Sequence, residues 1–297
     1  MKPLFRWPGG KRGLRDRIRQ KIDAQPPALF VEPFIGAGAI GLSVAAKYPQ
    51  AQLLFNDANA HLISLWRGLV YAPALLQLQI RRLENLYPHT STGYEAARQA
   101  FNHLTKVRAS WASSIDVQHD LELAAFVLYL GAHGYNGLWR VNSLGEFNSP
   151  FGGEQQAHFR YPAESAIAEV SQLLRGRTTF LAGDFEATTQ RVNAWLDEHD
   201  GDGVCDPRIT LYADPPYVGG FDLYTADGFA DEDQRRLADC LQQLACRGVR
   251  IIASNADDPL IREIYAWATI EPIAEARRIA AKPTRRKKAP CVLITCP

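Results

Sequence analysis

Short apolar runs alternate with longer helical patterns in the first sixty and the last 130 or so residues of the chain. The run at 29–31 is followed by a glycine turn, a helix-compatible stretch at 39–47 and a second run at 52–55 that ends at Asp57. This order of strand, glycine turn, helix, strand and acid predicts the opening βαβ unit of a nucleotide-binding sheet. Later strands are predicted at 178–181, 209–213, 249–253, 269–274 and 291–295, and helices at 187–199, 231–246 and 258–267.

The middle of the chain has a different pattern. Apolar residues recur at helical spacing in four long stretches with no strand pattern between them: 61–69, 74–86, 94–107 and 121–131. The segment 134–153 is rich in glycine, asparagine and aromatic residues, which predicts a hairpin or loop. We therefore expect an α/β domain built from residues 1–60 and 166–297, with a mainly helical domain inserted at 61–165 that carries a β-hairpin.

Composition is that of an ordinary soluble protein, with 46% hydrophobic and 22% charged residues in a chain of 297. The formal net charge is only +1, but basic residues gather near both ends of the chain. Residues 1–21 hold eight lysines and arginines against one acid, and residues 277–288 hold seven and no acid. Two basic clusters in a balanced chain indicate a phosphate-facing surface.

Targeting and metal signals are weak in this sequence. The five cysteines form no Cys-x-x-Cys pair and are odd in number, which favours a reduced cytosolic protein. No apolar run approaches the roughly 20 residues of a membrane span, and the first residues lack the apolar core of a signal peptide. The seven histidines form no ligand-spaced cluster. We therefore expect a cytoplasmic location, no membrane and no metal.

The most informative motif is the tetrapeptide that follows the strand at 209–213, Asp214-Pro215-Pro216-Tyr217. Two consecutive prolines continue neither a strand ladder nor a helix, so the backbone stops in one stiff, extended shape. The turn presents a carboxylate, a carbonyl and an aromatic ring at the carboxyl end of a strand, where open α/β sheets bind ligands. A planar base with an amino group fits these three features.

Two glycine-containing turns accompany the tetrapeptide. Gly36-Ala37-Gly38-Ala39-Ile40-Gly41 matches G-x-G-x-x-G, and Asp57 follows about twenty residues later, as in sites that bind the ribose of an adenosine cofactor. This spacing serves dinucleotides and S-adenosylmethionine equally. The turn Trp7-Pro8-Gly9-Gly10-Lys11 offers backbone N–H groups and a lysine for an anion.

Taken together and in order, these motifs resemble the Dam-like DNA adenine-N6 methyltransferases, the D12 class within the alpha group of amino-methyltransferases. The agreement covers five pieces across nearly the whole chain: 5–11, 31–38, 56–57, 134–152 and 214–217. The resemblance implies a Rossmann-like methyltransferase sheet with an inserted target-recognition domain. It also implies S-adenosylmethionine as methyl donor, S-adenosyl-L-homocysteine as product and double-stranded DNA as partner. We expect a bacterial or phage-encoded, nucleoid-associated protein that acts as a monomer or weak dimer on DNA.

The resemblance also assigns expected roles to residues of this sequence. Cofactor binding is expected of Trp7, Lys11, Phe34, Gly36, Gly38, Asp57, Asp184 and Phe185. Asp184 would accept a hydrogen bond from the adenine amine of the cofactor, with Phe185 beside the adenine ring. The catalytic set is Asp214, Pro215, Pro216 and Tyr217: Asp214 and the Pro215 carbonyl would accept from the target N6 amine, and Tyr217 would stack on the target base. Reaching this pocket requires the adenine to leave the duplex.

Site choice is expected to reside in the 134–152 segment and the basic ends. DNA contacts are expected of Arg6, Tyr135, Asn136, Leu138, Arg140, Asn142, Arg285, Arg286, Lys287 and Lys288. Arginine can bind guanine through two hydrogen bonds, asparagine can bind adenine, and an apolar side chain suits the thymine methyl. In the Dam-like group a similar segment recognises GATC. Trp139, Val141 and Pro8 depart from the commonest form, which weakens a strict assignment to GATC.

Three alternatives remain open from the sequence. The same chemistry could act on adenine in RNA or on cytosine N4 in DNA. The G-x-G-x-x-G match alone would also suit a nicotinamide-dependent oxidoreductase. A non-catalytic DNA-binding regulator could retain the fold, although it would not need Asp214 and Tyr217 together. The sequence does not decide whether the protein accompanies a restriction enzyme or acts alone.

Overall fold

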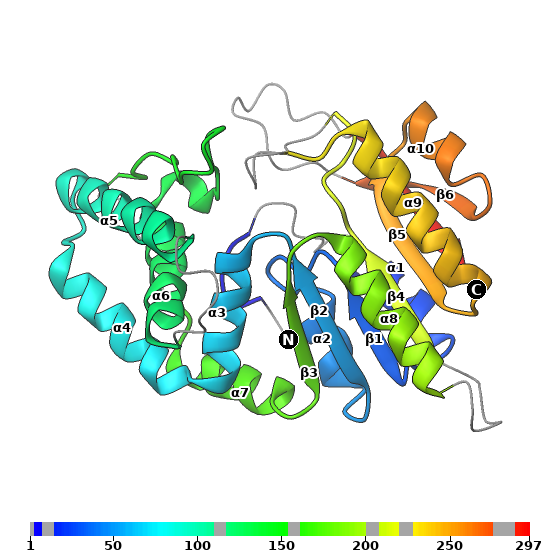
Figure 1. Cartoon of the computed structure of the whole chain (residues 1–297), viewed down its shortest axis with the longest axis horizontal. Helices are drawn as coiled ribbons and strands as arrows, with labels where there is room; N and C mark the ends of the chain where they lie inside the picture. Colours follow the sequence, from blue (N-terminus) through cyan, green and yellow to red (C-terminus); the bar gives the residue numbers. More distant parts are fainter. Residues whose placement is uncertain are drawn as a thin grey trace.

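The chain forms a mixed α/β fold around one twisted sheet (Figure 1). The computed structural model describes residues 3–7, 15–109, 117–153, 161–199, 208–219, 228–275 and 289–297. Within these ranges the seven-stranded sheet has the order β3-β2-β1-β4-β5-β7-β6. The strands are β1 (Leu29–Glu32), β2 (Gln52–Asp57), β3 (Thr178–Ala182), β4 (Ile209–Ala213), β5 (Arg250–Ala256), β6 (Thr269–Glu275) and β7 (Ala289–Cys296).

Strands β3, β2, β1, β4 and β5 run parallel, while β7 pairs antiparallel with both β5 and β6. The chain adds β2 and β3 on one side of β1 and then β4 and β5 on the other, so the order of strands reverses between β1 and β4, whose parallel pairing aligns Val31 with Leu211. Every residue of β1 and β4 is buried, as expected for parallel strands covered on both faces. The carboxyl ends of β1 and β4 thus meet at a topological switch point, where sheets of this kind bind ligands.

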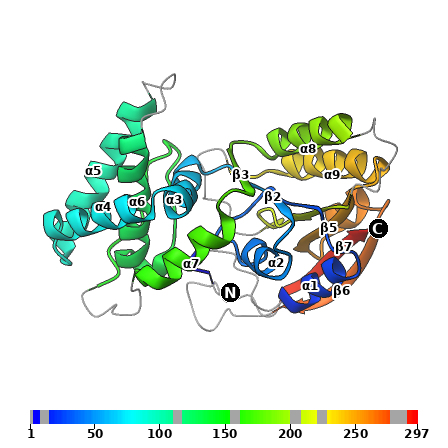
Figure 2. The same cartoon turned by 90° about the horizontal axis from the view of Figure 1, so that it is seen from below.

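Helices cover both faces of this sheet (Figure 2). On one face lie α8 (Phe185–His199) and α9 (Asp231–Cys246), and on the other lie α1 (Arg15–Asp23) and α2 (Gly41–Lys47). The short α10 (Pro259–Ile264) follows β5 and begins at Asp258, whose carboxylate accepts from Leu260 N. The three-layer arrangement confirms the predicted Rossmann-like class.

A group of helices lies beside the sheet, between β2 and β3 in sequence (Figure 1). It comprises α3 (Ala60–Tyr71), α4 (Pro73–Leu86), α5 (Ser91–Ala109), α6 (Val117–His133) and α7 (Glu164–Leu174). One cluster of buried side chains continues from the sheet into these helices, through Phe55, Trp66 and Phe101 among others. Because the core is continuous here, the division into domains at 61–165 stays a prediction.

The segment after α6 forms a short version of the predicted hairpin, with isolated bridges in place of continuous strands. A 3₁₀ turn (Tyr135–Gly137) is followed by two isolated antiparallel bridges, Gly134 with Phe151 and Val141 with Phe147. Below we call residues 134–151 the hairpin.

The predicted strands and long helices are confirmed, with ends shifted by a few residues. Helices α1 and α7 were not predicted. Among the described residues, none of the helices combines the length and apolar character that crossing a bilayer requires.

Candidate active site

Four predicted segments meet at one edge of the sheet. The glycine turn follows β1, Asp57 ends β2, Asp184 follows β3, and Asp214 follows β4. These strands are direct neighbours in the order β3-β2-β1-β4, so their carboxyl ends lie side by side. Asn56 ties the loops together, because its buried side-chain amide donates to the carbonyls of Pro33 (3.1 Å) and Gly183 (3.0 Å).

The two glycines Gly36 and Gly38 of the turn pack closely against tryptophan rings. Gly36 and Gly38 have φ of +50° and +68°, which glycine adopts without strain. A Cβ on Gly36 would lie 3.1 Å from the Trp7 ring, and one on Gly38 would lie 2.8 Å from the Trp66 ring. The Gly36 carbonyl also accepts from Trp66 Nε1 at 2.9 Å. The turn is therefore a backbone surface of fixed shape, suited to close approach of a ligand.

Asp57 and the buried Glu32 place two acids beside this turn. Asp57 accepts from the backbone N–H groups of Gly36 and Asn59, both at 3.0 Å. Desolvation nevertheless raises the pKa of Asp57 to about 6. Burial raises the pKa of Glu32 well above its usual range, and the charges of Asp214 and Asp57 add to this shift. At neutral pH Asp57 is ionised and available as an acceptor for hydroxyl groups, while Glu32 favours its neutral form.

An aromatic cluster flanks the acids. Phe34 and Phe185 lie 6.0 Å apart between ring centroids, and Phe229 packs against both at 5.9 and 6.0 Å. Asp184 is exposed beside them; its Oδ1 accepts from Glu186 N (2.9 Å) and Arg236 Nη2 (3.3 Å). The Arg236 guanidinium also lies over the Phe185 ring. Flat apolar faces next to a carboxylate suit a planar base with an amino group.

Asp214 is oriented by a hydroxyl pair on neighbouring strands. Ser254 Oγ on β5 donates to Asp214 Oδ1 at 2.9 Å, and the buried Tyr212 hydroxyl on β4 lies 3.0 Å from Ser254 Oγ. With Ser254 donating to the carboxylate, Tyr212 can donate to Ser254 and complete the chain. Burial, and next to it the charge of Asp214, raise the pKa of Tyr212 well above its usual range, so this hydroxyl keeps its proton.

Amide side chains hold the backbone after Asp214 at Pro216 and Val218. Gln234 of α9 donates to the Pro216 carbonyl at 2.7 Å, and Asn255 donates to Gln234 Oε1 at 2.9 Å. Asn255 Oδ1 also accepts from Val218 N. Both amides are about 1% exposed. This network gives the Asp214–Tyr217 turn one position relative to β5 and α9.

Arg140 and Asn142, both predicted to contact DNA, have hydrogen-bond partners inside the hairpin. Arg140 donates through Nε to Asn148 Oδ1 (2.7 Å) and through Nη2 to the Asn148 carbonyl (3.0 Å). Asn142 Oδ1 accepts from Leu144 N and Glu146 N, while its amide donates to Glu146. Asn142 therefore shapes the hairpin tip. Tyr135 and Asn136 are exposed, and Leu138 is partly buried.

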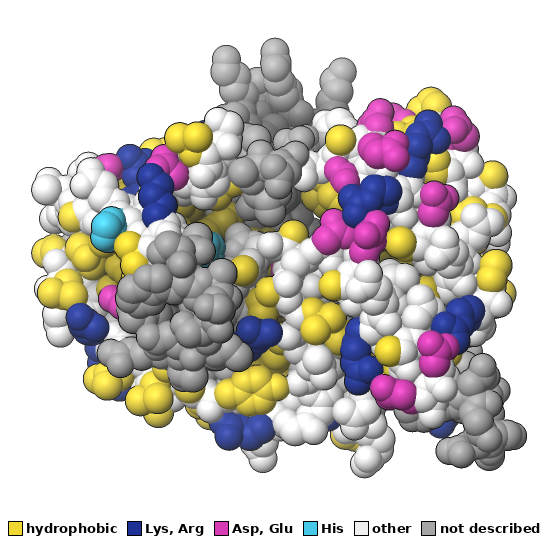
Figure 3. All heavy atoms as spheres, viewed as in Figure 1, with side chains coloured by type: hydrophobic (Ala, Val, Ile, Leu, Met, Phe, Trp, Pro, Cys, Tyr) yellow, Lys and Arg dark blue, Asp and Glu magenta, His cyan; other side chains and the backbone are white. Residues whose placement is uncertain are grey.

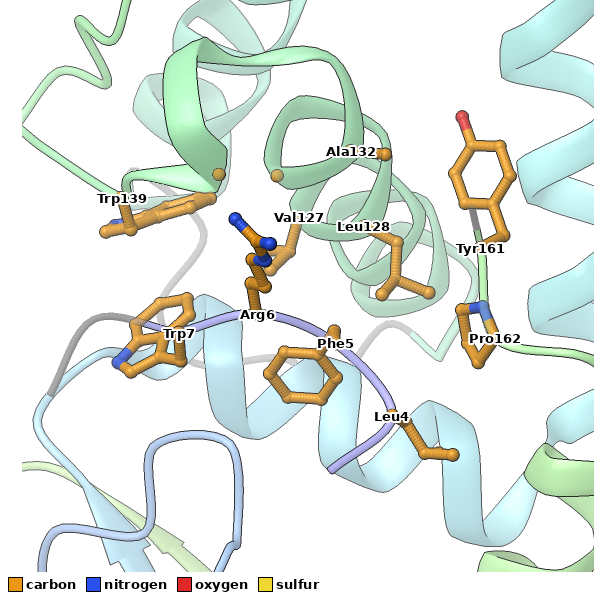
Figure 4. A pocket seen from close by; sticks show the side chains of 12 residues that line it. Leu4, Phe5, Arg6, Trp7, Val127, Leu128, Ala132, Trp139, Tyr161 and Pro162 are labelled. Atoms are coloured by element: carbon orange, nitrogen blue, oxygen red, sulfur yellow. The ribbon is translucent and has the colours of Figure 1, made fainter. Parts of the chain in front are cut away.

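Arg6 lies in a pocket between the N-terminal segment, α6 and the hairpin (Figure 4). Its side chain points from that segment toward Trp139, and Gly137 comes close to it: a Cβ there would lie 3.4 Å from Arg6 Cβ. Lys11 and the basic residues Arg285, Arg286, Lys287 and Lys288 lie outside the described residues. On the face shown in Figure 3, acidic and basic side chains are mixed over α8 and α9. Arg236 forms ion pairs with Asp184, Glu186 and Asp233.

The structure thus brings the predicted cofactor and catalytic residues to one edge of the sheet, Lys11 excepted. Several neighbours of that edge were not predicted: Glu32, Asn56, Tyr212, Phe229, Gln234, Ser254 and Asn255. Of these, only Glu32 and Asn56 lie inside a recognised motif. Among the described residues, no group of three or more histidine, cysteine or acidic side chains is arranged to hold a metal ion.

The chain is similar in sequence to a known family of proteins. Residues 7–279 match the family described as D12 class N6 adenine-specific DNA methyltransferase. The type II methyltransferase M1.LlaDCHI of Lactococcus lactis subsp. cremoris is 32% identical over 301 residues, which cover 99% of this chain and 95% of that protein. The retron Ec67 DNA adenine methylase of Escherichia coli is 31% identical, with 97% and 89% covered. The DNA adenine methylase of Escherichia coli K12 is 29% identical, with 96% and 91% covered.

Proposed function

Because the chain belongs to the D12 class of N6 adenine-specific DNA methyltransferases, we propose that its carboxyl-edge site transfers a methyl group to an adenine flipped out of duplex DNA, within GATC. The family implies S-adenosylmethionine, whose sulfonium supplies an electrophilic methyl group. The observation that carries the proposal is the orientation of Asp214 by Ser254 beside the rigid Pro215-Pro216 turn. Family membership favours this function over the oxidoreductase alternative.

The residues at this edge fit the proposed cofactor. Gly36 and Gly38 let the turn pack tightly on Trp7 and Trp66, which fixes the backbone surface against which a ligand would lie. Asp57, ionised above pH 6, would accept from the ribose hydroxyls. Phe34, Phe185 and Phe229 would enclose the adenine ring, and Asp184 would accept from its amine. For Asp184 to do so, the cofactor amine would share the carboxylate with Arg236.

The chemical problem is that the N6 lone pair of adenine is delocalised into the ring. Asp214 and the Pro215 carbonyl would accept hydrogen bonds from N6 out of the base plane, favouring a pyramidal nitrogen whose lone pair points at the methyl group. N6 would take the methyl group that S-adenosylmethionine supplies as its S–C bond breaks, S-adenosyl-L-homocysteine would leave, and the proton lost from the methylated N6 would pass to the Asp214 carboxylate and on to solvent. Preorganised acceptors stabilise the charge that develops on nitrogen in the transition state. Tyr217 would stack on the flipped base.

Site choice is proposed for the hairpin and Arg6. Arg140 is held by Asn148 in a defined orientation, which lowers the entropy cost of a two-point contact with guanine. Arg6 lines a pocket to which the hairpin contributes Gly137 and Trp139. Asn136 and Leu138 suit adenine and the thymine methyl. The internal hydrogen bonds of Asn142 favour a role in shaping the hairpin tip over direct contact with a base.

The test is Asp214→Ala, compared with Asp239→Ala as a matched control at an exposed acid of α9. We expect Asp214→Ala to lose methyl transfer to duplex DNA while still binding S-adenosyl-L-homocysteine in a calorimetric titration. Asp239→Ala should keep both. An Asp214→Ala protein with full activity would remove Asp214 from the mechanism. Nucleoside mass spectrometry of DNA and RNA substrates separates adenine N6 in DNA from adenine in RNA and cytosine N4.

A further inference from the structure

Two tryptophans from distant parts of the sequence stack at the junction of the helices and the sheet. The rings of Trp7 and Trp139 lie 5.5 Å apart between centroids at 25°, one on the N-terminal segment and one in the hairpin (Figure 4). Each tryptophan is adjacent in sequence to an arginine that we propose contacts DNA: Arg6 precedes Trp7, and Arg140 follows Trp139. The stack therefore holds these two backbone positions together.

Trp139 is buried among aromatic rings. It is 3% exposed, and within the described part of the chain its Nε1 has no hydrogen-bond partner. Phe147 lies 4.7 Å away on the returning side of the hairpin, and Phe101 of α5 meets the ring edge-on at 5.6 Å. Because the indole N–H has no partner among the described residues, we take the aromatic ring to be the feature of Trp139 that matters at this position.

Trp7 connects the stack to the glycine turn at Gly36, where we propose that the cofactor binds. Its Cδ1 lies 3.1 Å from the position of a Cβ on Gly36, so the indole packs directly on the Gly36 backbone. The same glycine donates to Asp57 through its N–H and accepts from Trp66 through its carbonyl. Phe5 links Trp7 to Trp66, with ring centroids 6.5 and 5.5 Å apart. A displacement of Trp7 thus alters the surface against which the cofactor would lie.

We propose that Trp139 is a positioning residue that, by stacking on Trp7, couples DNA binding at the hairpin to cofactor binding at the Gly36 turn. The inference rests on the proposed function and adds a means by which bound DNA changes the affinity for the cofactor, and bound cofactor the affinity for DNA. DNA that orders the hairpin stabilises the stack and with it the Trp7–Gly36 contact. Since coupling between two binding sites is reciprocal, bound cofactor raises the affinity for DNA by the same factor.

The experiment measures the affinity of S-adenosyl-L-homocysteine by calorimetry with and without a short duplex carrying the site that the wild-type protein methylates. For wild-type protein we expect the duplex to tighten binding about fivefold or more, the lower end of typical coupling. In Trp139→Leu this factor should fall to nearly one. Trp139→Phe should restore most of it, because the ring remains while the unpaired indole N–H is lost.

A double-mutant cycle separates coupling from general destabilisation. Trp139→Leu should weaken cofactor binding by roughly two- to tenfold, the range for loss of an aromatic pair, but should add nothing in a Trp7→Leu background. Trp267→Leu is the control, because Trp267 packs in the second core cluster, and we expect it to lower the melting temperature without changing the coupling.

The outcomes distinguish the two proposals. A wild-type protein that binds no cofactor and methylates no DNA contradicts the proposed function. A wild-type protein that methylates DNA but shows no coupling, or keeps it in Trp139→Leu, overturns the inference alone. If Trp139→Leu does not fold, Trp7→Leu takes its place in the experiment, since it removes the other ring of the stack. Coupling between DNA and cofactor binding that persists in Trp7→Leu also overturns the inference.

Discussion

Replacing Gly38 by alanine tests whether the glycine turn is shaped by tertiary packing. The residue has φ of +68°, and a Cβ would lie 2.8 and 2.9 Å from Cζ2 and Cη2 of Trp66. Trp66 is fully buried and its Nε1 is bonded to the Gly36 carbonyl, so the ring cannot move aside without losing that bond. Gly176→Ala is the matched control, because Gly176 has φ of +82° and open space around its Cβ position.

The two variants share backbone strain and differ in the collision. A left-handed backbone costs a non-glycine residue about 1–2 kcal/mol, which is the whole effect expected for Gly176→Ala. Overpacking a filled core adds about 1–3 kcal/mol, so Gly38→Ala should lose roughly 2–5 kcal/mol of unfolding free energy. For a chain of this size that corresponds to a fall in melting temperature of about 4–10 °C, against about 2–4 °C for the control.

Thermal and urea unfolding followed by circular dichroism measure both differences, with and without S-adenosyl-L-homocysteine. Gly38→Ala should also gain less thermal protection from the ligand than Gly176→Ala, since only Gly38 belongs to the proposed cofactor surface. Equal destabilisation of the two variants would refute the collision with Trp66. Full ligand protection of Gly38→Ala would refute the role of the turn in cofactor binding.

Three further predictions follow from the site. Ser254→Ala removes the donor to Asp214 and should lower kcat by roughly ten- to a hundredfold while cofactor affinity measured by calorimetry stays constant; an unchanged kcat would contradict this orienting role. Cofactor binding should weaken as pH falls through about 6, because protonated Asp57 loses acceptor capacity, and Asp57→Asn should bind weakly without that dependence. Since the folded-state pKa is raised, the stability that Asp57 contributes is present below about pH 4 and lost as pH rises through 6. Arg140→Ala should reduce discrimination between the site and its one-base variants by about 1–3 kcal/mol in competition assays, and unchanged discrimination would argue against guanine contact.

The helices and strands predicted best are those whose burial is visible in their own sequence pattern. Strands β1 and β4 are buried on both faces, so each is a short, mainly apolar run, and a proline follows shortly after each strand, at Pro33 and Pro215. Helix α1 was missed because Ile18 and Ile22, a single pair one turn apart, are its buried residues in a stretch otherwise dominated by charge. Helix α7 shows apolar spacing at 167, 170 and 174, but it crosses the predicted boundary at 165 and was divided by it.

In the site, too, the residues inside a local motif were predicted, and their partners from distant parts of the sequence were not. Motifs contiguous in sequence predicted the loops after β1, β2, β3 and β4, because each loop contains its own turn-forming and polar residues. The partners of those motifs come from elsewhere: Ser254 from β5, Gln234 from α9 and Phe229 from the segment before it. Their contribution depends on strand order and helix placement, which no local pattern encodes. The Trp7–Trp139 stack is of this kind, joining residues more than a hundred positions apart.

The most direct test of the central claim is base-modification sequencing, with nucleoside mass spectrometry, on DNA from a methylation-free bacterial host that expresses this chain. We predict N6-methyladenine at one short duplex site, GATC, and none in cells expressing Asp214→Ala. N6-methyladenine at a different site would correct the specificity and leave the chemistry intact. N4-methylcytosine, or unmodified DNA from cells containing folded, cofactor-binding protein, would contradict the assignment of this chain as an active adenine methyltransferase.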